Sequence, residues 1–281
     1  MSLLFPARLG VTAVLLGTIS TVALAETTEK KPETALEPIY VQLDGITEEG
    51  TVTTFSPGAM SVPAALDGGA LLSTIPGISG SRMGGHGIDI ILRGMSKNQL
   101  NVIDAGSFTY GGCPNRMDPP SSIATFYRAS RVVVEKGYAS VTNGPGAPAG
   151  TIRLEREAPS FESGKPVSGS FSLGGADNGG SGAVAGTVAV DLGHGFYLEA
   201  SGEAKTASDY EDGSGHKVRS SYTQKSAGVT LGYRDNGVDL AFDVETDRAE
   251  DVEFAGASMD SPLSKTVTYR LRGGSISMPA R

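Results

Sequence analysis

Tryptophan is absent from the 281 residues of the chain, and cysteine occurs only once, at Cys113. A single cysteine excludes an internal disulfide framework, so the thiol needs a different role. Aromatic residues make up only 6% of the chain, which argues against a large aromatic core. The formal net charge is -8 and the basic residues are scattered, which argues against a nucleic-acid partner. After residue 24, no apolar run approaches the length of a membrane-spanning helix.

The first 25 residues have the pattern of a secretory signal peptide. Arg8 precedes an uncharged, mostly apolar run from Leu9 to Leu24, which ends in the small-residue sequence Ala23-Leu24-Ala25. We therefore predict cleavage after Ala25 and export of the mature chain. The alternative is a membrane anchor, because the run is about as long as the shortest spanning helices. A mature chain that lies in a membrane would have to do so as a β-barrel.

Residues 26–50 are predicted to form a flexible tail. They are polar, carry charges of both signs and include Pro32 and Pro38. The short apolar island Ile39-Tyr40-Val41-Gln42-Leu43 interrupts this composition. Such an island can add as a strand to the sheet edge of a partner protein, and the alternative is a plain linker.

Residues 51–157 predict a compact α+β domain. β-Branched and alternating segments predict short strands, and two segments between them predict short helices. The expected strands are 88–93, 100–103, 131–135 and 151–156, and the expected helices are 63–72 and 121–127.

Residues 158–281 change to longer alternating segments joined by glycine-rich or Asn-Gly turns. The segments are 167–174, 183–192, 196–205, 226–233 and 238–246. Strands of about ten residues with short turns at one end are typical of a membrane β-barrel. The alternative is a soluble antiparallel sandwich.

The stretch from Gly111 to Pro120 contains the residues that indicate a particular chemical function most specifically. Copper(I) is a soft cation that prefers thiolate and thioether ligands, which Cys113 and Met117 supply. A helical turn after the cysteine would bring residues four apart to one face. The alternative is that Cys113 is a small buried hydrophobe and Met117 fills a gap in the core. A catalytic cysteine with His86 as base is a further alternative.

Met83 and His86 lie in the glycine-rich segment 81–87 and are candidates to guide the ion toward the site. The alternative is an ordinary solvated loop.

Several stretches together resemble the plug domain of TonB-dependent outer-membrane receptors. They are Leu92-Arg93-Gly94-Met95, the segment 132–137, the segment 143–146 and Gly150-Thr151-Ile152. The string Gly-Gly-Cys-x-x-Arg-Met-Asp-Pro-Pro narrows the resemblance to the TonB-dependent copper receptors. The resemblance covers residues 65–157 well and extends weakly to about residue 272.

The resemblance implies the architecture and the partners. It implies an α+β plug domain followed by antiparallel strands of an outer-membrane β-barrel, in a monomer surrounded by outer-membrane lipid. The tail would contain a TonB box at Ile39, Tyr40 and Val41, through which the TonB protein of the inner membrane couples energy to transport. The function implied is copper uptake rather than enzymatic catalysis, with Cu(I) favoured.

The last segment of the chain is too short for a complete barrel of this class. Barrels of this transporter class have about 22 strands, and only 122 residues follow Pro159. We therefore expect an incomplete barrel and a truncated chain, with further copper ligands of the family lying beyond residue 281. The alternative function is a truncated, non-transporting periplasmic binding fragment or a remnant of such a receptor.

Overall fold

The computed structural model describes residues 41–43, 46–60, 67–113, 115–138, 144, 146–257 and 259–275. The predicted signal peptide lies outside this range, as do Ile39 and Tyr40 of the predicted TonB box. Among the described residues, no helix is both long and apolar enough to cross a membrane.

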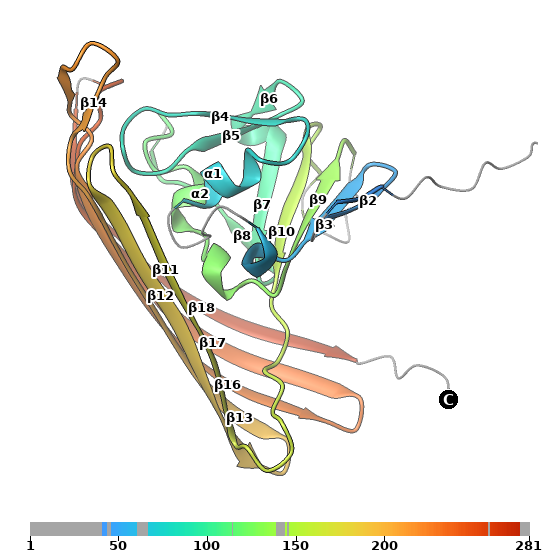
Figure 1. Cartoon of the computed structure of the whole chain (residues 1–281). Coiled ribbons are helices and arrows are strands. Elements are labelled where there is room, and N and C mark those ends of the chain that lie inside the picture. The colour runs from blue at the N-terminus through green and yellow to red at the C-terminus, as the bar shows by residue number, and fades with distance from the viewer. Residues whose placement is uncertain are drawn as a thin grey trace, which may run out of the picture. The chain divides into compact units, whose positions relative to one another are not determined.

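The N-terminal module is a mixed sheet with short helices and a second small sheet (Figure 1). The strand order of its main sheet is β1 (Val41–Leu43), β2 (Ile46–Glu49), β3 (Val52–Phe55), β9 (Arg131–Lys136), β10 (Gly150–Glu155), β7 (Leu100–Asp104) and β8 (Ser107–Thr109). Only the β10–β7 pair is parallel. The small sheet contains β4 (Ile78–Ser81), β5 (Asp89–Leu92) and β6 (Met95–Ser96). The helices are α1 (Gly68–Leu72), α2 (Pro120–Ile123), η1 (Pro57–Ala59), η2 (Lys97–Gln99) and η3 (Phe126–Arg128).

The core of this module lies between the main sheet and α1. β-Branched residues such as Val132, Val134 and Ile152 are completely buried in it, which suits their preference for a pleated surface. Leu71 and Leu72 of α1 pack into the same core. Asp67 starts α1, because its carboxylate accepts hydrogen bonds from the Gly69 and Ala70 amides at 2.8 and 3.3 Å.

The second part is a six-stranded antiparallel sheet. Its order is β11 (Val167–Ala176), β12 (Ser181–Gly193), β13 (Phe196–Ala207), β16 (Tyr222–Asp235), β17 (Val238–Val252) and β18 (Ser261–Ser275). A short hairpin of β14 (Tyr210–Glu211) and β15 (Lys217–Val218) lies between β13 and β16 in sequence.

The two faces of this sheet differ in chemistry. One direct cross-strand row contains exposed apolar side chains: Leu198, Leu231, Phe242 and Leu271. The adjacent row points to the opposite face because side chains alternate along a strand. That row contains Glu199, Thr230, Asp243 and Arg270. An exposed apolar face backed by a polar face is typical of the wall of an outer-membrane barrel.

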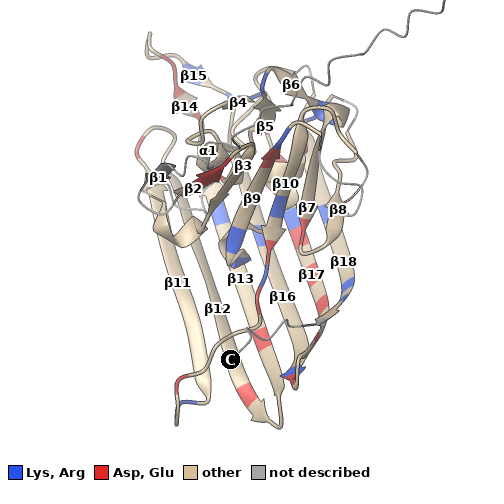
Figure 2. Cartoon of the chain, turned by 90° about the vertical axis from the view of Figure 1, so that its right-hand side faces the viewer, with Lys and Arg blue, Asp and Glu red and all other residues tan. Residues whose placement is uncertain are grey.

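Figure 2 shows how charge is distributed along the sheet. β11 and β12 carry almost no charged residues, whereas β13 and β17 carry bands of both signs and β18 carries basic residues only. The charge of the sheet is therefore concentrated on the strands that follow β12.

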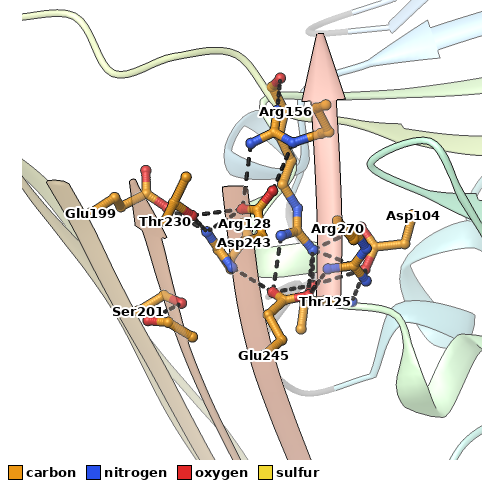
Figure 3. Close-up of polar contacts among 12 residues, drawn as sticks. Asp104, Thr125, Arg128, Arg156, Glu199, Ser201, Thr230, Asp243, Glu245 and Arg270 are labelled. Carbon is orange, nitrogen blue, oxygen red and sulfur yellow. Dashed lines mark hydrogen bonds and ion pairs between the residues drawn. The ribbon is translucent and has the colours of Figure 1, made fainter. Parts of the chain in front are cut away.

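Buried ion pairs join these strands to the N-terminal module (Figure 3). Four arginines and four carboxylates take part: Arg128, Arg156, Arg270, Arg272, Asp104, Glu199, Asp243 and Glu245. Arg128 lies at the end of η3 and reaches Glu199 at 2.6 Å and Thr230 at 2.8 Å. Arg156 follows β10 and bonds both oxygens of Asp104 at 2.8 Å. The opposite charges match in number, so the interface can be buried without an uncompensated ion.

Glu245 of β17 is at the centre of this cluster. Its Oε1 accepts hydrogen bonds from Arg128 and, at 2.9 Å, from Arg156. Its Oε2 accepts from Arg270 of β18. One wall carboxylate thus binds two arginines of the N-terminal module and one of the sheet.

The sequence-based expectations differ from the structure mainly at the ends of the elements. β2 and β3 form a hairpin at residues 46–55, so strand structure begins within the segment assigned to the tail. The hairpin turns at Gly50, whose φ of 59° suits glycine. β18 was not among the expected strands, although the segment 261–275 alternates apolar with polar or charged residues from about residue 266 to residue 272.

Candidate metal centre

Residues 111–113 and 115–120 lie in a loop held by Asp118. One carboxylate oxygen of Asp118 accepts a hydrogen bond from the Gly112 amide at 2.7 Å, and the other accepts from the Cys113 amide at 2.9 Å. The Arg116 amide donates to the Cys113 carbonyl at 2.9 Å. The backbone around the thiol is therefore held by three hydrogen bonds within one short loop.

The expected helical turn from Cys113 to Met117 does not form. Arg116 has a φ of +62°, in the left-handed region, and helix α2 begins only at Pro120. The reason is the Asp118 carboxylate, which takes up the backbone amides and closes a loop in place of a helix.

Arg116 anchors this loop to the N-terminal module. It is buried and forms a two-point contact with Asp89 of β5, at 2.9 and 3.3 Å. Two parallel hydrogen bonds to a carboxylate restrict the guanidinium in orientation as well as in position. The loop that carries Cys113 is thereby tied to a strand of the module.

Cys113 is half-buried and Met117 is only 5% exposed. Met117 belongs to an apolar cluster with Tyr222, Val252 and Phe254 of the six-stranded sheet and its loop, and Cys113 packs against this cluster. Burial of Met117 agrees with a packing role, which was the alternative reading of this residue. It also places the Met117 thioether in the cluster against which the Cys113 side chain packs.

Cys113 and Met117 line one cavity of about 380 Å³. His86 and Met259 line it as well, from the segment before β5 and the segment before β18. The structure thus joins a thiol, two thioethers and an imidazole from three separate segments. Met259 had no assigned role in the sequence, because nothing in its local pattern shows which cavity it faces.

Met83 takes a different position from the other candidates. It packs against the apolar cluster around Met117, but it is not among the residues that line the cavity. Its carbonyl accepts a hydrogen bond from the Gly256 amide at 2.7 Å. Met83 therefore joins the N-terminal module to the loop before β18.

The solvated-loop alternative for His86 is wrong, since the residue is only 7% exposed. Its Nε2 lies 3.1 Å from Gln224 Oε1, and its ring meets the Tyr222 ring edge-on with centroids 5.2 Å apart. The close approach depends on neighbouring glycines: a Cβ on Gly85 would lie 1.8 Å from the Ser220 carbonyl oxygen. Glycine at this position is what allows the segment to reach the sheet.

Burial lowers the pKa of His86 from 6.5 to about 4, and the nearby Lys205 ammonium acts in the same direction. The ring is therefore neutral at neutral pH. A neutral imidazole offers one nitrogen with a free electron pair, as a metal ligand requires.

The lowered pKa predicts a pH-dependent stability. Below pH 6.5 the unfolded chain binds a proton at His86 that the folded chain excludes until about pH 4. The free energy of unfolding should therefore fall as the pH falls through this window, by about 2 kcal/mol between pH 8 and pH 5. Urea unfolding of wild type and His86→Gln across this range measures the difference. An equal pH dependence in both proteins would contradict the prediction, and His216→Gln, at an exposed histidine, is the matched control.

Within the described residues, no three side chains of His, Cys, Asp or Glu are placed to hold a metal ion together. The cavity lining also includes the carboxylates of Asp118, which accepts hydrogen bonds from two amides of its own loop, and of Asp260, which pairs with Arg219. Apart from serine hydroxyls, the remaining side-chain donors are the sulfur atoms of Cys113, Met117 and Met259 and the imidazole of His86. This set suits a soft ion such as Cu(I) better than Mg²⁺ or Ca²⁺, which prefer oxygen ligands.

Comparison with known proteins gives one family and several solved structures. Residues 45–151 match the model of the TonB-dependent receptor plug domain. The structure of the copper transporter OprC is 31% identical over 80% of this chain and 34% of its own, with a TM-score of 0.72. No curated protein matches the chain by sequence.

Two further solved structures share the fold at lower identity. The ferric enterobactin receptor PfeA from Pseudomonas aeruginosa is 15% identical over 72% of this chain and 34% of its own, with a TM-score of 0.56. The siderophore receptor PirA from Acinetobacter baumannii is 15% identical over 72% and 32%, also with a TM-score of 0.56. The chain spans about a third of the length of each of these three structures.

Proposed function

The chain belongs to the TonB-dependent receptors, and on this premise we propose that it serves copper uptake across the outer membrane, with the ion held by Cys113 and Met117. The plug domain carries the loop of Cys113 and Met117, and the adjoining sheet contributes further residues to the cavity that they line. The observation that carries the copper assignment is that the only cysteine and Met117 line the same cavity.

The chemistry of the two ligands supports copper as the transported substrate. A thiolate and a thioether are soft donors and favour Cu(I) over hard cations. The thiol must lose its proton to bind the ion, so binding releases one proton to solvent. The thiolate then cancels the charge of Cu(I), which lowers the cost of placing the ion in a partly apolar cavity.

The loop around Cys113 supports the same assignment. Asp118 holds the Cys113 amide, and Arg116 ties the loop to Asp89. A loop that is already ordered loses little conformational freedom when the ion binds. The similarity to the copper transporter OprC, at 31% identity, favours copper over the iron chelates of the more distant matches.

TonB-dependent receptors work with TonB, and we propose that the segment Ile39-Tyr40-Val41 is the TonB box. Val41 begins β1, which is the outermost strand of the main sheet in the described part of the chain. An edge strand can release from its sheet and pair with a partner.

Measuring Cu(I) binding in Cys113→Ala and Met117→Leu tests the site. Each variant should bind Cu(I) at least about 100-fold more weakly than wild type, because even an outer partner of a metal ligand is worth about 10- to 100-fold. Leucine keeps the size of Met117 and removes only the sulfur. The measurement is competition with a colorimetric Cu(I) chelator.

Met95→Leu is the matched control, since Met95 packs against the core of the N-terminal module and not at the cavity. Wild-type affinity in Cys113→Ala and Met117→Leu would refute the assignment.

A further inference from the structure

The loop between β17 and β18 takes part in burying Met117. We call its described residues, 253–257 and 259–260, the strap. Phe254 of the strap is only 2% exposed and belongs to the same apolar cluster as Met117. Met259 of the strap lines the cavity as well. Because Met117 is itself only 5% exposed, its thioether is largely enclosed while this packing is in place.

Backbone packing holds the strap against the N-terminal module. The Gly256 amide donates to the Met83 carbonyl at 2.7 Å. A Cβ on Gly84 would lie 2.4 Å from the Glu253 carbonyl oxygen and 3.0 Å from Phe254 Cδ1. The strap therefore lies directly on residues 83 and 84, with no room for one more carbon atom at Gly84.

Arg219 binds both ends of the strap. Its guanidinium forms an ion pair with Asp260, the last strap residue, and lies 3.5 Å from the carboxylate of Glu253, the first. Asp260 also accepts a hydrogen bond from the Phe254 amide at 3.2 Å. The Arg219 side chain is 58% exposed, and ion pairs in contact with water are weak enough to break and form again.

We propose that the strap is a lid on the copper site, which opens to admit the ion, and that Arg219 is the residue that holds it closed. This inference rests on the proposed function, in which Met117 binds Cu(I). Opening withdraws Phe254 from the apolar cluster and exposes the thioether, and closing encloses the bound ion. The rates of entry and exit are then set by how often the strap opens.

Hydrogen exchange of the metal-free full chain tests the lid without copper. The Gly256 amide is bonded to Met83 across the contact that has to open, so its exchange rate reports the open fraction. Arg219→Ala should raise this rate about fivefold, the upper value for an exposed ion pair. Amides of β9, in the sheet of the N-terminal module, should keep their wild-type rates. An unchanged rate at Gly256 would overturn the role of Arg219.

Stopped-flow transfer of Cu(I) between the full chain and a colorimetric chelator measures entry and exit. Arg219→Ala should speed both about fivefold and leave the affinity nearly unchanged, because the strap covers the empty and the loaded site alike. Asp260→Asn should also speed both, since the amide loses the ion pair but can still accept from the Phe254 amide. Circular dichroism checks that each variant is folded.

The two variants change the charge near the cavity in opposite directions, which separates a lid from electrostatic steering of the ion. Steering predicts faster entry in Arg219→Ala and slower entry in Asp260→Asn. That pair of results would overturn the lid, whereas faster entry and exit in both supports it. Arg248→Ala is the matched control, because Arg248 forms an exposed ion pair with Glu250 and does not line the cavity.

Failure of the lid and failure of the proposed function give different results. If Cys113→Ala loses Cu(I) while Arg219→Ala transfers it at wild-type rates, the proposed function stands and the lid fails. If Cys113→Ala and Met117→Leu both bind Cu(I) as wild type does, the proposed function fails and the lid on this site fails with it. Equal acceleration in Arg219→Ala and Arg248→Ala would also overturn the specific role of Arg219.

Discussion

Replacing Glu245 by alanine should lower the free energy of unfolding of the chain by about 3–5 kcal/mol. The side chain is 10% exposed and pairs with Arg128 and Arg156 of the N-terminal module and Arg270 of the sheet. Removing it leaves three guanidinium groups close together with less opposite charge between them. Each arginine keeps another carboxylate partner, so the cost comes from one buried positive charge that is no longer compensated.

Urea unfolding followed by circular dichroism measures the effect of Glu245→Ala. Glu250→Ala is the matched control on the same strand, β17, because the ion pair of Glu250 with Arg248 is exposed to solvent. A surface pair of this kind is worth about 0–1 kcal/mol. If the two variants lose equal stability, the cluster does not hold the module to the sheet. Proteolysis should also cut the N-terminal module of Glu245→Ala faster.

Replacing Gly85 by alanine should destabilise the chain by about 3 kcal/mol, at the upper end of the range for overpacking. The new Cβ would lie 1.8 Å from the Ser220 carbonyl oxygen, which belongs to the backbone and cannot rotate away. The segment 83–87 has to move from the sheet instead. His86 moves with it and loses its contact with Gln224.

Thermal unfolding and the histidine signals in NMR spectra report the two consequences of Gly85→Ala. Gly58→Ala is the matched control, because a Cβ at Gly58 meets no atom within 4 Å. That change should be neutral or slightly stabilising, since alanine restricts the unfolded chain. A wild-type His86 signal in Gly85→Ala would contradict the close approach on which the prediction depends.

Most strands of this protein could be predicted from the sequence, because the pattern that indicates each strand lies within the strand itself. In β-branched runs such as 131–136 and in alternating segments such as 196–207, the local residues predict the strand and its apolar face. The pairing of one alternating strand with the next needs only a short turn. The hairpin of β2 and β3 was less predictable, because β3 pairs with β9, which lies about 80 positions later in the chain.

The burial of His86 could not be predicted, because it does not depend on the local sequence. Its own segment, Met83-Gly84-Gly85-His86-Gly87, is rich in glycine and resembles a solvated turn. Whether such a segment is exposed depends on what it docks against, and here the partners are Ser220, Tyr222 and Gln224 of the sheet. These residues lie more than one hundred positions later in the chain.

The sequence by itself determined the soft donors and their spacing, because Cys113 and Met117 lie four positions apart in a segment that ends in two prolines. Only the tertiary structure decided which further side chains share the cavity, since His86 and Met259 come from segments with no common pattern. It also decided the backbone of the loop, where side-chain capping by Asp118 replaced the helical turn. Donor type is a property of each residue, whereas convergence on one cavity depends on how the N-terminal module packs against the sheet.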